Sequence, residues 1–221
     1  PLKIFGLKDE FVFFSDFQFS IRKGWDVLLK AYYEEFSNKE KVVLLLKMYE
    51  AMPGHPKSEK IILSSINSIK KQIKKKNLPR VLWFRRMLPD KMLPNLYAVA
   101  NCFVLPTRGE GFCLPLCQAM SMCIPCIATN WSAHTDFAND KNCYMIDYKM
   151  IDTHSDMLWH PGYRGAKYAD PSVPHLRKLM RRVFEHYEEA VKKGVRARKD
   201  ILENYTWSKA ADRIIERVFE R

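Results

Sequence analysis

A glycine-rich segment at residues 106–115 carries the side chains best suited to bind and orient a ligand. Its glycines let the backbone approach a ligand closely, and Glu110 between them offers a carboxylate. Leu114 and Pro115 begin a predicted helix, whose free N–H groups can receive phosphate or sugar oxygens. Gln118 follows eight residues after Glu110, further along that helix. Glycines, an acid and a helix start together indicate a site for an oxygen-rich ligand.

A second segment, residues 20–24, places two adjacent cations at the entrance of another predicted helix. Arg22 and Lys23 stand directly before Gly24 there. Two cations suit a diphosphate, because the N-terminus of a helix adds its own positive field. The spacing alone is equally compatible with Arg22 and Lys23 being solvated loop charges.

The elements that must position these segments alternate along the chain. Short apolar runs predict buried strands at residues 10–15, 41–49, 81–84, 102–105 and 125–128, and residues 142–147 are a candidate sixth strand. Helical spacing predicts helices at 27–35, 61–69, 89–100 and 114–122. The pattern predicts an α/β fold: a single Rossmann-like doubly wound domain over residues 1–221, with a parallel sheet covered by helices on both faces. Ligands of such sheets bind outside the carboxyl ends of the strands.

The C-terminal third is predicted to be less regular. Residues 152–171 mix His, Trp, Gly, Tyr and Pro, which favours an irregular segment. Two helices are expected to close the chain, one over 176–187 and one over about 206–220, with Thr206 as the N-cap of the second. We expect the apolar stripe of this last helix to pack on a further domain. The chain begins at Pro1, which favours a fragment or a processed product.

Composition restricts the partner and the compartment. The net charge of +12 favours an anionic partner: nucleotide phosphates, nucleic acid or an acidic membrane surface. Six cysteines among apolar or small residues, with no signal peptide and no apolar run long enough for a membrane span, predict reduced thiols in a cytoplasmic protein. Cys123 and Cys126 form a C-x-x-C pair, but no second pair completes a zinc site, so no metal is expected. No nucleic-acid-binding motif is present either.

The segment at residues 110–115, followed by 118–120 and 124–129, closely resembles the signature of the family-4 retaining glycosyltransferases. In that signature a Glu is followed after seven residues by a second Glu, then by Ala-Met and an apolar strand. The resemblance extends over nearly the whole chain, to residues 22–29, 96–100 and 205–207.

This resemblance implies the GT-B fold, in which two Rossmann-like domains enclose the active site, and this chain would be the C-terminal, donor-binding domain. It implies that Lys23, helped by Arg22, neutralises the diphosphate of a nucleotide sugar, and that Glu110 holds sugar hydroxyls near the reacting carbon. Lys23 and Glu110 are therefore the candidate catalytic residues. Cations and helix N–H groups stabilise the charge that develops on the diphosphate, so neither a metal nor a cofactor is required. The implied partners are the nucleotide sugar, a sugar acceptor and an N-terminal domain, and we also consider a membrane surface.

The resemblance also assigns the remaining binding residues. The sugar and the phosphates would meet the backbone of Gly111, Phe112, Cys113 and Leu114. Gln118 stands at the position of the ribose-binding Glu, and the loop 84–87 would lie near the base. For His134 we expect a loop role with a contact to the donor rather than catalysis. The residues His154, His160 and His175 receive no role.

Several positions depart from the family pattern. Gln118 replaces the second Glu, and an amide bonds a ribose hydroxyl more weakly than a carboxylate does. Cys113 and Cys123 replace glycines, and Cys113 would add bulk beside the diphosphate. Phe17 or a neighbour stands where many members carry a further phosphate-binding Arg. These departures leave open a non-catalytic relative that binds nucleotide sugars. We also consider a sugar epimerase on the same fold and a basic nucleic-acid-binding domain.

Overall fold

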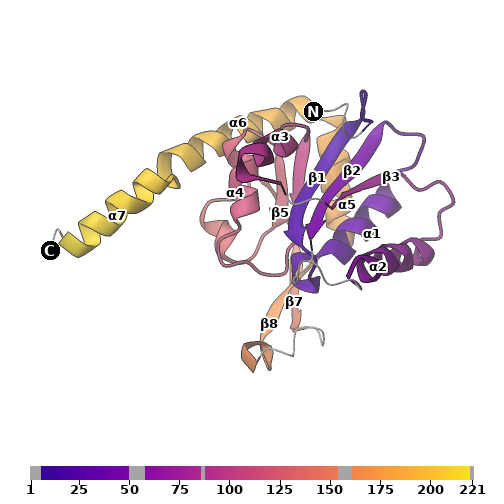
Figure 1. Cartoon of the computed structure of the whole chain (residues 1–221), viewed down its shortest axis with the longest axis horizontal. Helices are drawn as coiled ribbons and strands as arrows, with labels where there is room; N and C mark the ends of the chain where they lie inside the picture. The colour runs from indigo at the N-terminus through magenta and orange to yellow at the C-terminus, as the bar shows by residue number, and fades with distance from the viewer. Residues whose placement is uncertain (1–5, 50–57, 86–87, 154–160, 220–221) are drawn as a thin grey trace.

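The computed structural model describes residues 6–49, 58–85, 88–153 and 161–219. Its centre is a six-stranded sheet with the order β3-β2-β1-β4-β5-β6, in which all neighbouring strands are parallel (Figure 1). The strands are β1 (Phe11–Gln18), β2 (Val42–Tyr49), β3 (Arg80–Phe84), β4 (Cys102–Leu105), β5 (Cys126–Thr129) and β6 (Tyr144–Ile146). Each of the six predicted strands is present.

Helices connect these strands and cover both faces of the sheet. They are α1 (Trp25–Glu35), α2 (Ser58–Gln72), α3 (Leu93–Tyr97), α4 (Leu114–Ser121), α5 (Val173–Glu185), α6 (Tyr187–Asn204) and α7 (Trp207–Phe219), with 3-10 helices at Ile21–Lys23, Asp90–Met92, Ala133–Asp136 and Pro161–Tyr163. Phe13 of β1 contacts Tyr32 of α1, with ring centroids 6.5 Å apart. Its neighbour Phe14 contacts Tyr97 of α3 at 5.0 Å. Because successive side chains of a strand point to opposite faces, α1 and α3 lie on opposite sides, and the doubly wound α/β prediction is confirmed.

The C-terminal part holds three helices, α5, α6 and α7, so the prediction of two closing helices was wrong. The buried residues of α6 are small apart from one: Ala190, Gly194, Ala197 and Ile201. A Cβ at Gly194 would lie 2.2 Å from the carbonyl oxygen of Cys123, so α6 packs against the turn before β5 with no room for a side chain. Gly194 also stands in the middle of α6, where a glycine argues against a helix when the sequence alone is considered.

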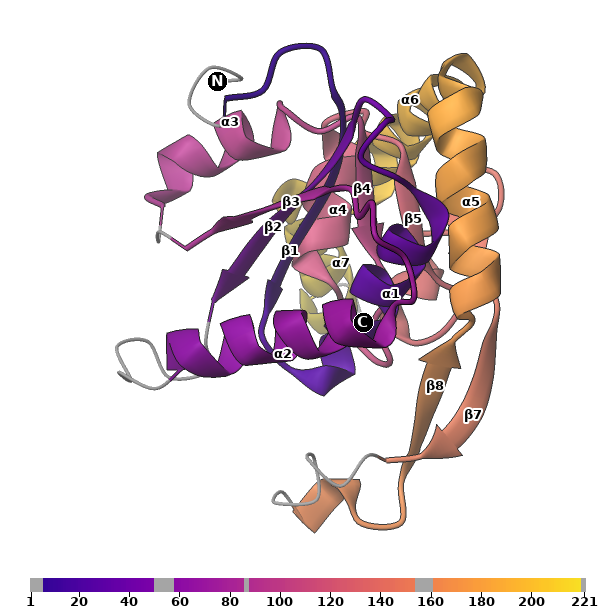
Figure 2. The ribbon, with the colours of Figure 1, turned by 90° about the vertical axis from the view of Figure 1, so that its right-hand side faces the viewer.

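The segment 152–171 is not irregular throughout, contrary to the prediction. β7 (Tyr148–Asp152) and β8 (Lys167–Pro171) form an antiparallel hairpin that extends beyond the carboxyl edge of the sheet (Figure 2). None of the residues of β7 is buried, and only Ala169 and Pro171 of β8 are. Strands that bury so little lack the apolar alternation by which strands are predicted.

The last helix, α7, leaves the body of the molecule (Figure 1). It begins where predicted, and the N–H of Lys209 donates to Thr206 Oγ1 at 3.3 Å. None of its described residues is buried, and even its large apolar side chains are open to solvent: Trp207 is 86% and Phe219 is 75% exposed.

Candidate functional site

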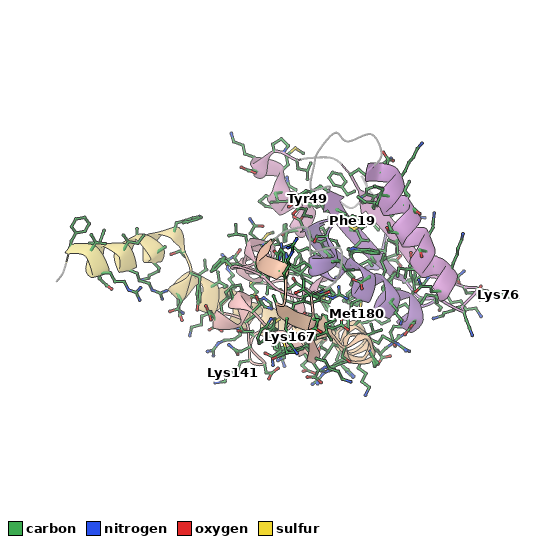
Figure 3. All side chains as sticks on the ribbon, turned by 90° about the horizontal axis from the view of Figure 1, so that it is seen from below. Phe19, Tyr49, Lys76, Lys141, Lys167 and Met180 are labelled. Carbon is green, nitrogen blue, oxygen red and sulfur yellow. The ribbon has the colours of Figure 1, made fainter. Side chains whose placement is uncertain are left out.

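The candidate site lies at the carboxyl edge of the sheet, where the loops after β1 and β4 meet. These strands are neighbours although the chain passes through β2 and β3 between them, so the strand order reverses here. Ligands of open α/β sheets bind at such a switch point. Figure 3 views the molecule from this edge and labels Phe19 and Tyr49, at the ends of β1 and β2, whose backbones are joined by a hydrogen bond of 2.7 Å.

The centre of the site is an ion pair between Lys23 and Glu110. Lys23 Nζ donates to both carboxylate oxygens of Glu110, at 2.7 and 2.8 Å. Arg22 Nη1 lies 3.4 Å from Glu110 Oε2, and Thr107 Oγ1 donates to Glu110 Oε1 at 2.9 Å. The side chains of Lys23 and Glu110 are only 12% and 6% exposed. The two segments singled out in the sequence are thus brought together, with two cations around one carboxylate.

A glycine allows the two loops to approach this closely. Gly24 has a φ of +69°, and a Cβ there would lie 1.8 Å from the carbonyl oxygen of Pro106. Directly beside it, the N–H of Arg108 donates to the carbonyl oxygen of Arg22 at 2.7 Å. The fold therefore requires glycine at position 24, both for its backbone conformation and for lack of space.

Arg108 is a functional candidate that was absent from the sequence prediction. Its side chain is only 6% exposed and donates two hydrogen bonds to Asp26 in the first turn of α1, at 2.7 and 2.8 Å. Its Nη2 also donates to Asp170 Oδ1 of β8 at 2.9 Å. Arg108 therefore joins the glycine-rich loop to α1 and to the hairpin. No local signal marks it, because its partners are 82 and 62 positions away.

A cavity of about 530 Å³ opens beside Glu110, between the glycine-rich loop and the hairpin β7–β8. A Cβ added at Gly109 or Gly111 would meet nothing within 4 Å, and neither residue has a positive φ. The fold therefore does not need glycine at these positions, in contrast to Gly24. The missing side chains leave open surface, which is what the predicted close approach of a ligand requires.

Cys113, the residue before α4, stands where the family pattern has a glycine. Its φ of 75° is left-handed, the conformation in which glycine is the unstrained residue. The side chain is 4% exposed, and burial raises the pKa of its thiol to about 12. The thiol is thus enclosed by protein, although Glu110 and Lys23 are near enough for their charges to act on it, and the expectation that Cys113 adds bulk beside the diphosphate stays a prediction.

Three further predicted binding residues lie along the outer side of α4. Phe112 and Leu114 are 39% and 54% exposed. Together with Gln118 they line a second cavity of about 700 Å³, between α4 and the beginning of α7. Gln118 Oε1 accepts a hydrogen bond from the hydroxyl of Tyr97 at 3.2 Å. Of the predicted binding residues, Arg22, Glu110 and Gly111 thus line the first cavity and Phe112, Leu114 and Gln118 the second, whereas Lys23 and Cys113 line neither.

His134 lies buried below the site. Its Nε2 is 2.6 Å from the carbonyl oxygen of Thr129, and its Nδ1 has no hydrogen-bond partner among the described residues. Burial lowers the pKa of the imidazole, and the charges of Glu110 and Lys23 act on it more weakly. A neutral, fully enclosed ring of this kind holds the loop after β5 in place.

The sequence of residues 8–155 matches the family model described as glycosyl transferases group 1. The chain belongs to the group 1 glycosyltransferases. A similar curated protein is the O-antigen chain mannosyltransferase B of Escherichia coli, which is 40% identical over 60 residues, 26% of this chain and 16% of that protein.

Solved structures share the fold of this glycosyltransferase chain. Anabaena HepE in complex with UDP-glucose has a TM-score of 0.72 at 14% identity, and the match covers 100% of this chain and 51% of that one. The C-terminal domain of LpcC, a group 1 family protein from Francisella tularensis, has a TM-score of 0.63 at 15% identity, over 89% of this chain and 87% of that one. The chain therefore spans about half the length of HepE and has the fold of one half of a GT-B protein.

Further findings concern the cysteines, possible metal ligands and possible membrane spans of this glycosyltransferase chain. Across the described residues no group of three or more His, Cys, Asp or Glu side chains could hold a metal ion. All six cysteines are unpaired thiols. Within the described ranges no helix is long and apolar enough to cross a bilayer. Residues 86–87 of the loop predicted near the base, and also His154 and His160, lie outside the described residues.

Proposed function

We propose that this chain binds the nucleoside-diphosphate sugar donor of a retaining glycosyl transfer. The observation that carries the proposal is the convergence of Arg22 and Lys23 on Glu110 at the carboxyl edge of the sheet. Membership of the group 1 glycosyltransferases supports it, as does the UDP-glucose bound to Anabaena HepE. The retaining outcome rests on the resemblance of residues 110–129 to the family-4 signature.

In this proposal different residues of the site bind the diphosphate and the sugar of the donor. Lys23 and Arg22 neutralise the diphosphate, whose oxygens gain negative charge as the bond to the sugar breaks. The N-terminus of α4 adds a positive field on the same side. Glu110, whose carboxylate is oriented by Lys23 and Thr107, accepts hydrogen bonds from sugar hydroxyls. Because these groups stabilise the leaving diphosphate, we propose a transfer that needs no metal ion.

Transfer itself belongs to a larger protein in this proposal. The chain covers 51% of HepE, and α7 exposes a stripe of large apolar side chains that includes Trp207, Ile214 and Phe219. We propose that this stripe packs on a second Rossmann-like domain, which also binds the acceptor. The difference in tryptophan emission between the wild type and Trp207→Phe isolates Trp207 from the other four tryptophans, and this difference should shift to shorter wavelength in the whole protein.

A calorimetric titration of the chain with UDP, GDP, ADP and CMP, and with their nucleotide sugars, tests donor binding. We expect one base to bind selectively and Lys23→Ala to weaken it at least about tenfold, because a charge-assisted hydrogen bond contributes roughly 1.5–3 kcal/mol. Lys76→Ala is the matched control, since Lys76 is exposed and lies at the periphery of the molecule (Figure 3). Binding of no nucleotide, or equal losses in both variants, would contradict the proposal.

A further inference from the structure

We propose that the hairpin β7–β8 is the sugar-side wall of the donor site, with Tyr163 and Tyr168 contacting the sugar ring and Arg108 positioning the hairpin. This inference rests on the proposed function and deepens it. It assigns the cavity beside Glu110 to one part of the donor, the sugar, and it gives the hairpin a role in selecting the nucleotide sugar over the bare nucleoside diphosphate.

The position of the hairpin is the first observation. It extends past the carboxyl edge of the sheet, on the same side as the loops after β1 and β4 (Figures 1 and 2). The cavity of about 530 Å³ lies between it and the glycine-rich loop, with Arg22, Glu110 and Gly111 on the loop side. The hairpin side is formed by Tyr163, Lys167 and Tyr168. Because Arg22 lines this cavity, a ligand whose diphosphate lies at Arg22 and Lys23 can extend one of the two groups attached to the diphosphate towards the hairpin.

The chemistry of the cavity is the second observation. Three aromatic residues, Trp131, Tyr163 and Tyr168, share it with the carboxylate of Glu110. A sugar ring presents apolar C–H groups on its faces and hydroxyls around its rim. Aromatic rings with a polar end suit the faces, and a carboxylate accepts from the hydroxyls. A bare phosphate gains nothing from aromatic walls, and a carboxylate directly beside them suits the hydroxyl rim of a sugar, so we assign the cavity to the sugar and leave the nucleobase to be distinguished by the test.

The attachment of the hairpin is the third observation. Asp170 of β8 accepts from Arg108 at 2.9 Å, and the N–H of the neighbouring Ala169 donates to the carbonyl oxygen of Arg108 at 3.3 Å. The guanidinium also lies over the ring of Tyr168, 5.8 Å from its centroid. Since Arg108 stands two residues before Glu110 and is held by Asp26, these bonds fix the distance between the hairpin and the carboxylate.

The test compares two affinities in the same protein, for the preferred nucleoside diphosphate and for its nucleotide sugar, measured by calorimetry on the 221-residue chain. Tyr163→Ala and Tyr168→Ala should each weaken nucleotide-sugar binding about tenfold and leave nucleoside diphosphate binding unchanged. Tyr168→Phe keeps the ring and should keep most of the affinity, whereas Tyr168→Leu removes the aromatic ring and replaces Tyr168→Ala if that variant does not fold. Lys149→Ala is the matched control, because Lys149 is an exposed residue of β7 that does not line the cavity.

The positioning role of Arg108 has its own variants. Asp170→Ala removes the bond to the hairpin and leaves the Arg108–Asp26 pair in place, so it should lower nucleotide-sugar affinity about threefold to tenfold. Asp170→Glu keeps the carboxylate and should restore part of that affinity. A merely structural role would lower the thermal midpoint in both variants without changing the ratio of the two affinities.

The outcomes separate this inference from the proposed function. If the wild-type chain binds no nucleoside diphosphate, the proposed function is contradicted, and so is the inference that rests on it. A wild-type chain that binds both ligands, with hairpin variants that weaken both equally or neither, defeats the inference alone. Selective loss of the nucleotide sugar in the tyrosine variants and in Asp170→Ala, with Lys149→Ala unchanged, is the result we expect.

Discussion

Lys23 and Glu110 are separated by 87 positions in the chain, yet the ammonium nitrogen of Lys23 lies 2.7 and 2.8 Å from the two carboxylate oxygens of Glu110. Both side chains are largely shielded from water, so the pair is screened less than a surface salt bridge would be. A diphosphate that binds Lys23 must therefore compete with Glu110 for the same ammonium group. The hydrogen bonds that Glu110 would accept from sugar hydroxyls can offset part of the free energy lost when Lys23 leaves Glu110 for the diphosphate.

This competition predicts that one substitution weakens the binding of the nucleotide sugar without weakening that of the nucleoside diphosphate. Glu110→Gln removes the competing carboxylate, so we expect the nucleoside diphosphate to bind as tightly as in the wild type, or up to about tenfold more tightly, a gain of ~1.4 kcal/mol. The nucleotide sugar should bind more weakly, because a neutral amide replaces a charged acceptor. Calorimetry with both ligands measures the two effects. A large loss of nucleoside diphosphate binding in Glu110→Gln would show that Glu110 does not compete with the phosphates.

Two glycines of the site should respond differently to the same change. Gly24→Ala places a methyl group 1.8 Å from the oxygen of Pro106 on a backbone with positive φ, so we expect a loss of stability of about 3 kcal/mol or more. Gly111→Ala meets no atom and should change stability by less than about 0.5 kcal/mol. Urea unfolding measures both. We expect Gly111→Ala to bind the nucleotide sugar about tenfold more weakly (roughly 1.4 kcal/mol), and unchanged binding would show that no ligand approaches this backbone.

The sheet could be predicted because most of its strands are buried on both faces and read as continuous apolar runs. β2 is the plainest case, since all but the last of its residues are buried. α6 was missed, because its contact with the Cys123 turn leaves no room for a side chain at position 194 and so places a glycine in the middle of the helix. Its Gly194 would itself argue against a helix.

The centre of the candidate site could be predicted from local motifs, whereas its supports could not. Lys23 and Glu110 stand in short segments of unusual composition, and the reversal of strand order brings such segments together. Arg108 depends on Asp26 and Asp170, which come from a helix and from a hairpin that no pattern marks. The direction of the Cys113 side chain depends on a backbone dihedral angle that residue types alone do not reveal.

A buried ion pair next to the site gives a prediction about stability. Lys47 of β2 donates to Asp16 of β1 at 2.9 Å, and their side chains are 11% and 7% exposed. Lys47→Met leaves the Asp16 carboxylate buried without its partner, which should cost about 3–5 kcal/mol. Burial already raises the pKa of Asp16, so the loss should shrink as the pH falls and the carboxyl group becomes protonated.

The matched control for this pair is the double variant Asp16→Asn with Lys47→Met. It removes both charges, and it should therefore recover most of the stability that Lys47→Met loses. Urea unfolding at pH 7 and at pH 5 measures the three proteins. A double variant as unstable as Lys47→Met would mean that packing of the lysine stem, and not the unpaired charge, causes the loss.

The enclosed imidazole of His134 should make the protein less stable in mild acid. Burial lowers the pKa of His134 below the ordinary value of 6.5, so the unfolded chain binds a proton more readily than the folded one. Stability from this group is complete above pH 6.5 and decreases as the pH falls from 6.5 towards the folded pKa, by about 1.4 kcal/mol for each pH unit that separates the two values. The difference in unfolding free energy between the wild type and His134→Gln, measured from pH 5 to pH 8, isolates this contribution from those of other groups. The difference should move in favour of His134→Gln as the pH falls, and a constant difference would mean that His134 titrates alike in the folded and unfolded chains.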